Sequence, residues 1–189
     1  MMHDVIQLNN VAKSFGGNMV IKDFSAEIPL SGVTVIRGQS GAGKTTLLRL
    51  LLGLEQPDAG KILWMAGRKP AVVFQEDRLL PWANALENAA LGSDEERARE
   101  ALQKLGLGES MCLLPRELSG GMKRRVAIAR ALAYGGDLLL LDEPFTGLDE
   151  ENKRIAANAM LEAHIPILVI THDASEADLF GEYCEIVID

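Results

Sequence analysis

The sequence predicts an α/β fold: a mainly parallel sheet covered by helices, an N-terminal antiparallel β subdomain, and an inserted α-helical subdomain. Apolar and polar residues alternate along Val5–Leu8 and Met19–Ile28, which is the pattern of antiparallel strands with one exposed face. From residue 137 to residue 188, short apolar strands alternate with helices, as in parallel sheets covered on both faces. Between these parts, at about 76–134, the pattern is helical. We therefore expect a single domain over residues 1–189 with a helical insertion.

The individual elements follow from apolar spacing and turn residues. Gly32–Gly38 is predicted to be a short buried strand, and Lys44–Leu54 a leucine-rich helix that ends near Gly53. In the helical part, Ser93 precedes Glu96 by three residues, which predicts a capping box at the start of a helix. The other expected elements are strands Lys61–Met65 and Ala71–Phe74, helix Val126–Ala133, strand Asp137–Leu141, helix Glu150–Ala163, strand Ile167–Thr171, helix Ala174–Phe180 and strand Tyr183–Ile188.

Charge and composition exclude several classes of protein. The 27 acidic and 19 basic side chains give a formal net charge of −8, which disfavours binding to nucleic-acid phosphates. The densest basic run, Lys123–Arg125, is flanked by apolar positions and is interpreted as a solvated helix face. Cys112 and Cys184 lack the spacing of a zinc site, and we expect both to be small core residues. No apolar run approaches the ~20 residues of a membrane span, so we expect a soluble, cytoplasmic protein that reaches a membrane only through a partner.

A glycine-rich turn between the predicted strand and helix fits a phosphate-binding loop. The segment GQSGAGKT, which begins at Gly38, has the spacing G-x-x-x-x-G-K-[ST]. Glycines allow successive backbone N–H groups to converge on phosphate oxygens at a helix N-terminus. In this pattern Lys44 supplies a positive charge at the β- and γ-phosphates, and the hydroxyl of Thr45 is a Mg²⁺ ligand. The sequence therefore predicts a P-loop NTPase core.

Two further motifs carry chemistry. The apolar strand LLLL ends at Asp142 and Glu143, where Asp142 is expected to hold Mg²⁺ and Glu143 to polarise an attacking water. Within the helical insertion, a second glycine-rich segment is expected to begin a helix at Ser119, Gly120 and Gly121. Its backbone N–H groups are donors at the positive end of that helix. One compact monomer cannot easily place both glycine-rich sites on the same γ-phosphate. The second site therefore is expected to complete a nucleotide site on another copy.

This set of motifs resembles the ATP-binding cassette (ABC) ATPases nearly from end to end. LLLLDEP is similar to the family's Walker B motif, LSGGM to its signature sequence, and THD, at residues 171–173, to the segment of its switch histidine. Gln75 matches the Q-loop glutamine, Asp149 the D-loop, and Phe15 the aromatic residue that stacks on adenine. The Walker A motif is matched by Gly38, Gln39, Ser40, Gly41, Ala42, Gly43, Lys44, Thr45 and Thr46.

The resemblance implies a mechanism. Two copies close head to tail around two ATP molecules, each held between the Walker A motif of one copy and the signature of the other. Glu143 would be the general base, and His172 would contact the γ-phosphate. Gln75 would contact Mg²⁺ or water, together with Thr45 and Asp142, and Asp149 would cross the dimer interface.

Within this family, the segment FQEDRLLPW followed by LEN resembles the nitrate/sulfonate/taurine and thiamine importer type. This resemblance implies a membrane permease that docks on Gln75–Trp82, with Leu79, Leu80 and Trp82 as contacts. It also implies a solute-binding protein in the same system, and a peripheral position on the inner face of the membrane. In this chain Arg124 replaces a glutamine common in the family, and we expect its charge to alter nucleotide contacts from the opposite copy.

Two other classes remain open from sequence. A non-transport ABC ATPase of DNA repair, chromosome organisation or translation would need a long coiled-coil insertion or a second cassette, and the insertion here is short. A small-molecule kinase with a phosphate-binding loop would leave LSGGM and His172 without a role.

Overall fold

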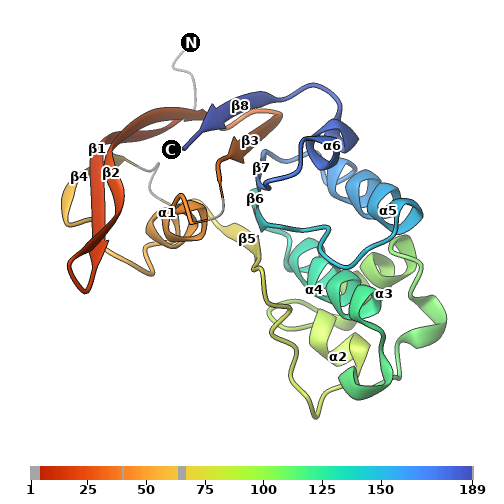
Figure 1. Ribbon diagram of the computed structural model, residues 1–189. Coiled ribbons are helices and arrows are strands. Elements are labelled where there is room, and N and C mark those ends of the chain that lie inside the picture. Colours follow the sequence, from red (N-terminus) through yellow and green to blue (C-terminus); the bar gives the residue numbers. More distant parts are fainter. Residues whose placement is uncertain (1–4, 40, 64–66, 189) are drawn as a thin grey trace.

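The computed structural model describes residues 5–39, 41–63 and 67–188. A three-stranded antiparallel sheet and a five-stranded parallel sheet form its frame (Figure 1). The antiparallel sheet has the order β2-β1-β4 and consists of β2 (Asn18–Pro29), β1 (Val5–Phe15) and β4 (Ala59–Leu63). The parallel sheet has the order β5-β6-β7-β3-β8, with β5 (Pro70–Val73), β6 (Leu138–Asp142), β7 (Ile167–Ile170), β3 (Val33–Arg37) and β8 (Cys184–Val187). The α/β fold class predicted from the sequence is confirmed.

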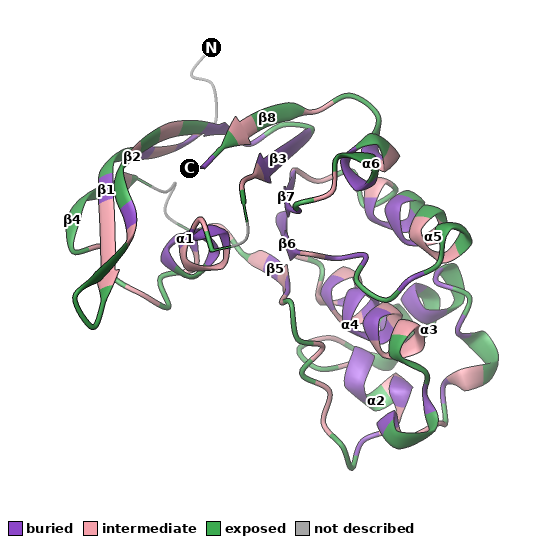
Figure 2. Ribbon diagram, in the orientation of Figure 1, coloured by how far each residue is buried: buried purple, intermediate pink, exposed green. Residues whose placement is uncertain are grey.

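Side chains of the parallel strands alternate between two apolar cores. Leu138 and Leu140 of β6 pack on the side of α1 (Lys44–Leu51) and the antiparallel sheet, whereas Leu139 and Leu141 pack on the other side. That second core is covered by α4 (Gly120–Tyr134), α5 (Glu150–Leu161), α6 (Ala174–Ala177) and the 3₁₀ turn η3 (Asp178–Phe180). Figure 2 shows the central strands as buried along their length, because both faces are covered.

The helical segments of the middle of the chain pack on one another. They are α2 (Ala85–Ala89), α3 (Glu95–Lys104), the 3₁₀ turns η1 (Gly108–Ser110) and η2 (Pro115–Glu117), and α4. Their shared interior contains Ala98, Leu102 and Val126, all fully buried. The chain leaves β5 at its carboxyl end and returns through α4 to the amino end of β6, so these helical segments form the crossover between two neighbouring parallel strands (Figure 1).

The capping prediction was wrong by one residue. Asp94, not Ser93, is the N-cap of α3, and its carboxylate accepts a hydrogen bond of 2.9 Å from the N–H of Arg97. Asp and Ser are nearly equal as N-caps, so adjacent candidates cannot be separated by residue type alone. A true capping box occurs at α2, where Asn84 and Glu87 each accept a hydrogen bond from the other's backbone N–H.

Other expectations also differ from the structure. Cys112 and Cys184 are exposed rather than core residues. The predicted strand Lys61–Met65 corresponds to β4, and its residues 64 and 65 lie outside the described part of the chain. Among the helices that the structure describes, none is long and apolar enough to cross a membrane.

Candidate active site

The phosphate-binding loop connects β3 to α1 and depends on glycine at two positions. Gly43 has a φ of +89°, and a Cβ there would lie 2.9 Å from the carbonyl oxygen of Val20. A Cβ on Gly38 would lie 2.3 Å from the carbonyl oxygen of Ile188, so the loop also passes too close to the end of the chain for any side chain. Ser40, which the sequence also assigned to this loop, lies outside the described residues.

Lys44 and Thr45 begin α1 and point into the loop and toward β6. The Nζ of Lys44 donates hydrogen bonds to the carbonyls of Gly38 at 2.7 Å and Gln39 at 2.9 Å, and the side chain is largely buried. The hydroxyl of Thr45 donates to Oδ2 of Asp142 at 2.9 Å. Residues 97 positions apart thus meet at the ends of β3 and β6, because the carboxyl ends of parallel strands lie at the same edge of a sheet.

A cavity of about 270 Å³ lies at this edge. Four separate parts of the chain line it: Val20, then Gly41, Gly43, Lys44, Thr45 and Thr46, then Gln75, and finally Asp142 and Glu143. A larger cavity of about 640 Å³ lies beside the C-terminal end of α1 and β4, and none of the described residues predicted to carry chemistry lines it. The smaller cavity is therefore the candidate site.

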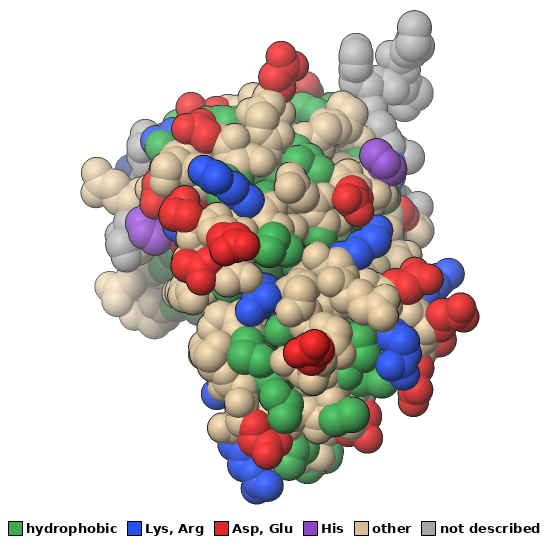
Figure 3. Space-filling model, turned by 90° about the vertical axis from the view of Figure 1, so that its right-hand side faces the viewer, with side chains coloured by type: hydrophobic (Ala, Val, Ile, Leu, Met, Phe, Trp, Pro, Cys, Tyr) green, Lys and Arg blue, Asp and Glu red, His purple; other side chains and the backbone are tan. Residues whose placement is uncertain are grey.

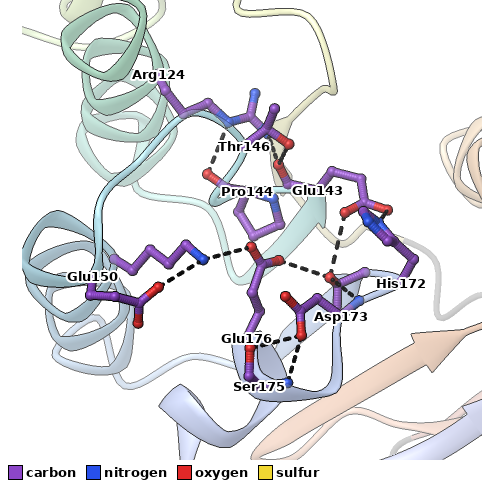
Figure 4. A network of polar contacts seen from close by, with 11 residues as sticks. Arg124, Glu143, Pro144, Thr146, Glu150, His172, Asp173, Ser175 and Glu176 are labelled. Atoms are coloured by element: carbon purple, nitrogen blue, oxygen red, sulfur yellow. Dashed lines mark hydrogen bonds and ion pairs between the residues drawn. The ribbon is translucent and has the colours of Figure 1, made fainter.

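Glu143 follows β6 with its backbone in the left-handed region, at a φ of +48°. Its N–H donates to the carbonyl of Ile170 at 2.8 Å, and its own carbonyl accepts from the hydroxyl of Thr146 at 3.1 Å. Oε1 of Glu143 lies 2.8 Å from Nδ1 of His172, which follows β7 (Figure 4). Left-handed backbone on a non-glycine residue is costly and clusters at functional sites, where surrounding contacts maintain it.

Two ionisable groups of the site have shifted pKa values. Burial raises the pKa of Asp142, against the hydrogen bond from Thr45 that lowers it. The pKa of His172 is raised because the imidazole is hydrogen-bonded to, and attracted by, the carboxylate of Glu143. His172 is otherwise largely exposed, so its environment is set mainly by Glu143.

The remaining predicted residues lie outside the cavity. The hydroxyl of Ser119 caps α4 by accepting from the N–H of Met122 at 3.2 Å, and Gly120 and Gly121 form the first turn. Asp149 caps α5, and hydrogen bonds from Asn152 lower the pKa of its carboxyl. Phe15 lies at the end of β1, is 40% exposed and contacts the ammonium of Lys13. Within the described chain, none of these side chains lines the cavity, so one copy brings together only part of the predicted set.

The chain is similar to transport ATPases in both sequence and structure. A profile of the family described as ABC transporter matches residues 21–146, more than half of the chain. The chain belongs to the ABC transporter family. An aliphatic sulfonates import ATP-binding protein of Pseudomonas aeruginosa is 41% identical over 185 residues, covering 91% of this chain and 68% of the relative. One of Paraburkholderia xenovorans is 42% identical over 181 residues, with 91% and 72% covered.

Two solved structures of one ABC transporter cassette show the same fold. The dimeric structure has a TM-score of 0.82 at 30% identity, covering 95% of this chain and 94% of the cassette. A post-hydrolysis state bound to ADP and phosphate has a TM-score of 0.82 at 29% identity, with 96% of each chain covered. The prediction that this chain is the ATP-hydrolysing subunit of an ABC importer is confirmed. The non-transport and kinase alternatives are not favoured.

The interpretation of Arg124 as part of a solvated face of this ABC ATPase was wrong, and two polar side chains next to the site were not singled out from the sequence. Arg124 is 2% exposed and donates to backbone carbonyls of its own copy, so it is not part of a solvated helix face. Thr171 is fully buried, and its hydroxyl donates to Glu176 at 2.8 Å and lies 3.4 Å from Oε2 of Glu143. The sequence feature that indicates Thr171 is its position as a polar residue at the end of an apolar strand. Its partner Glu176 could not be identified from spacing.

The contact between His172 and Glu143 predicts a pH-dependent contribution to stability. Because the pKa of His172 is raised in the folded protein, the contribution is fully present below about pH 6.5 and is lost as pH rises through the folded-state value. His172→Gln should lower the free energy of unfolding by about 0.2–1 kcal/mol at about pH 5.5, the range of exposed ion pairs, and by nearly nothing at about pH 9. Denaturant titrations at several pH values measure the difference. A difference that does not change with pH would contradict the assignment.

Proposed function

We propose that this subunit binds the phosphates of ATP in the 270 Å³ cavity and hydrolyses the γ-phosphate with a water activated by Glu143. The observation that carries the proposal is the convergence of Lys44, Thr45, Gln75 and Glu143, from separate parts of the chain, on one cavity. The backbone N–H groups of the loop and of the first turn of α1 are the expected phosphate donors. Lys44, already held inside the loop, adds the positive charge.

Glu143 is proposed to accept the proton of the attacking water. Its Oε1 is held by His172 and its backbone by Ile170 and Thr146, so the carboxylate is oriented before substrate arrives. Such positioned general-base catalysis contributes about 10²- to 10⁴-fold. His172, exposed at the mouth of this arrangement, is proposed to contact the γ-phosphate, and Gln75 to contact the water or the metal.

The residues of the cavity fit a magnesium ion. Thr45 and Asp142 present a hydroxyl and a carboxylate, the hard oxygen ligands that Mg²⁺ prefers, 2.9 Å apart. Burial raises the pKa of Asp142, and a bound cation would offset this loss of solvation of the carboxylate. Thr45 and Asp142, with Gln75, would hold the ion, which when bound neutralises charge on the β- and γ-phosphates.

A second copy is proposed to complete the site. Ser119–Gly121 lie at the N-terminal end of α4 with their backbone donors outside the cavity of their own copy. Asp149, which caps α5, is proposed to cross the interface between the copies, and Phe15, which is 40% exposed at the end of β1, is proposed to stack on adenine. A head-to-tail dimer would bring the signature of one copy to the phosphates of the other. The similar cassette described as dimeric supports the association of two copies.

We call residues Gln75–Trp82 the docking loop, because the permease is proposed to bind there. Trp82 is 74% exposed, an unusual position for so large an apolar side chain, and Leu79 and Leu80 are half-buried beside it. Buried Asn88 anchors the end of the loop by accepting from the N–H of Leu80 and donating to the carbonyls of Leu80 and of Ala83, the residue that follows the loop. Figure 3 shows hydrophobic side chains gathered in the lower part of the molecule, at the level of α2, α3 and α4 in Figure 1.

Trp82→Ala is expected to leave the ATPase rate and the melting temperature of the isolated subunit nearly unchanged, because the side chain is mostly in solvent. Stimulation of ATPase by the permease should fall, since interface hot spots, at which truncation to alanine costs about 2 kcal/mol or more, are enriched in Trp. The measurement compares ATPase rates with and without the reconstituted permease. A joint fall of basal rate and melting temperature would show that Trp82 packs the fold instead.

The cargo is proposed to be a small sulfonate or a similar anion, delivered by a solute-binding protein to a permease at the inner face of the membrane. The basis is the similarity to subunits named for aliphatic sulfonate import. The test is co-expression with a permease and a solute-binding protein of an aliphatic sulfonate import system. Sulfonate-stimulated ATPase in proteoliposomes is expected, and stimulation by a different solute alone would overturn the choice of cargo.

A further inference from the structure

The side chain of Arg124 is the largest fully buried side chain of the described structure and carries a positive charge. It comes from α4, the helix that begins with Ser119–Gly121, and reaches the carboxyl ends of β5 and β6. All three of its nitrogens donate, and all but one of the acceptors are backbone carbonyls. Nε donates to Pro144 at 2.9 Å, Nη1 to Phe74 at 2.5 Å, Gln75 at 3.3 Å and Oδ1 of Asp77 at 3.3 Å, and Nη2 to Asp142 at 2.7 Å and Glu143 at 2.6 Å.

These carbonyls mark the place where two paired strands separate. β5 and β6 pair in parallel up to Val73 and Leu141, and no further pair follows in their register. The next carbonyls on each strand, those of Phe74 and Asp142, are the ones that Arg124 binds. Buried carbonyls without partners are costly, and the guanidinium has five N–H donors in a rigid plane. Arg124 thus continues the connection between the strands beyond the end of the ladder.

The bond to Glu143 has a direct consequence for the site. The carbonyl of Glu143 accepts from Nη2 of Arg124 and from both the hydroxyl and the N–H of Thr146. These donors fix the peptide plane that follows the left-handed residue, at a φ of +48°. The direction of the carboxylate toward the cavity and His172 depends on this plane (Figure 4).

We propose that Arg124 is a positioning residue that joins the base of the docking loop to the backbone of Glu143. The proposal builds on the proposed role of Glu143 as general base. A displacement of Phe74–Gln75, or of α4, moves the guanidinium and with it the peptide of Glu143. The structure thereby provides one rigid connection from the proposed permease contact, and from the signature helix, to the group that activates water.

The test uses Arg124→Lys and Arg124→Gln in the full chain. Lysine keeps the charge, but a single ammonium cannot bind both strand ends; glutamine has two donors instead of five. We expect kcat for ATP hydrolysis to fall about 10- to 100-fold, the loss typical of a misplacement of about 1 Å, with KM and the Kd for ATP within about twofold of the wild type. Full rescue by Arg124→Lys would show that only the charge matters and would overturn the proposal.

Arg125→Gln is the matched control. Arg125 is adjacent on the same helix, and its Nη1 donates to the carbonyl of Leu105 at 2.8 Å, inside the helical part and away from the cavity. It should change stability without lowering kcat. An equal loss of kcat in both variants would show a general effect of loosening α4.

Thr146→Val keeps the proposal testable if the Arg124 variants fold poorly. Thr146 is exposed, and its hydroxyl is a second donor to the same carbonyl. The variant should show a smaller fall in kcat, again with unchanged Kd for ATP. An unchanged kcat would contradict control of Glu143 through this carbonyl.

A double variant separates this inference from the role of Glu143 itself. In Glu143→Gln, adding Arg124→Lys should lower the residual single-turnover rate less than twofold, because the group that it positions is already gone. A further tenfold loss would refute positioning through Glu143. If Glu143→Gln alone retains the full rate, the proposed base is wrong; if it loses the rate but Arg124→Lys does not, only the inference about Arg124 fails.

NMR provides a readout that does not depend on activity. The chain has three histidines, so the ring signals of His172 can be assigned by substitution. Since His172 lies 2.8 Å from the carboxylate of Glu143, its ring signals should shift in Arg124→Lys and not in Arg125→Gln. Unchanged His172 signals in Arg124→Lys would show that Glu143 has not moved.

Discussion

Glu143→Gln is expected to reduce ATP hydrolysis by about 10²- to 10⁴-fold, the loss typical of a missing general base. The amide keeps the size of the carboxylate but cannot accept a proton from water. The same change removes a negative charge from a cavity that must hold the γ-phosphate, so the affinity for ATP should be equal or higher. Phosphate release and a fluorescence titration with ATP measure the two effects separately.

The variant should also trap the dimer. If ATP connects the phosphate-binding loop of one copy to Ser119–Gly121 of the other, blocked turnover stabilises the closed state. Size-exclusion chromatography with Mg²⁺-free ATP should then show a shift from monomer to dimer. A variant that stays monomeric at saturating ATP would contradict the head-to-tail arrangement for this chain.

Ser119→Arg, added to Glu143→Gln, is the control for the interface. Ser119 is an exposed N-cap outside the cavity of its own copy, so a larger side chain should leave ATP binding by the loop intact. It should block the approach of the signature to the partner's phosphates and abolish the shift to dimer. Dimerisation of this double variant would show that Ser119–Gly121 do not complete the second site.

Lys44→Ala is expected to weaken ATP binding by about 10- to 150-fold, which corresponds to the ~1.5–3 kcal/mol of a charge-assisted hydrogen bond. The ammonium is buried inside the loop beside the cavity, so the charge acts on phosphate with little screening by solvent. Isothermal titration with ATP measures the affinity. Unchanged affinity would refute the assignment of this loop to the phosphates.

Lys104→Ala is the matched control for charge. Lys104 lies on the surface of α3, where it pairs with Glu162 at 3.0 Å, far from the cavity lining. It changes the net charge by the same amount, so it should not alter the affinity for ATP. The melting temperatures of both variants show whether Lys44→Ala also loosens the loop, since Lys44 binds the carbonyls of Gly38 and Gln39.

The parts of this ABC ATPase that depend on contiguous residues could be predicted from the sequence. The phosphate-binding loop needs backbone donors, glycines at set positions and a lysine next to them, and all of these lie within residues 38–46. The carboxylates Asp142 and Glu143 could be found because they end a continuous apolar strand. Helices and strands followed from apolar periodicity, with errors of a few residues where two neighbouring caps were equally suited, as at Ser93 and Asp94.

The residues that support this site are brought together by contacts between segments far apart in sequence. Thr45 and Asp142 meet because two strands far apart in sequence end at one edge of the sheet. Arg124 belongs to a run of three basic residues, a pattern that predicts a solvated helix face. Its burial depends on the place where β5 and β6 stop pairing, which cannot be found from the residues around Arg124. Unpaired carbonyls at the end of a ladder require a donor, and only the packing of α4 against β5 determines which side chain can reach them.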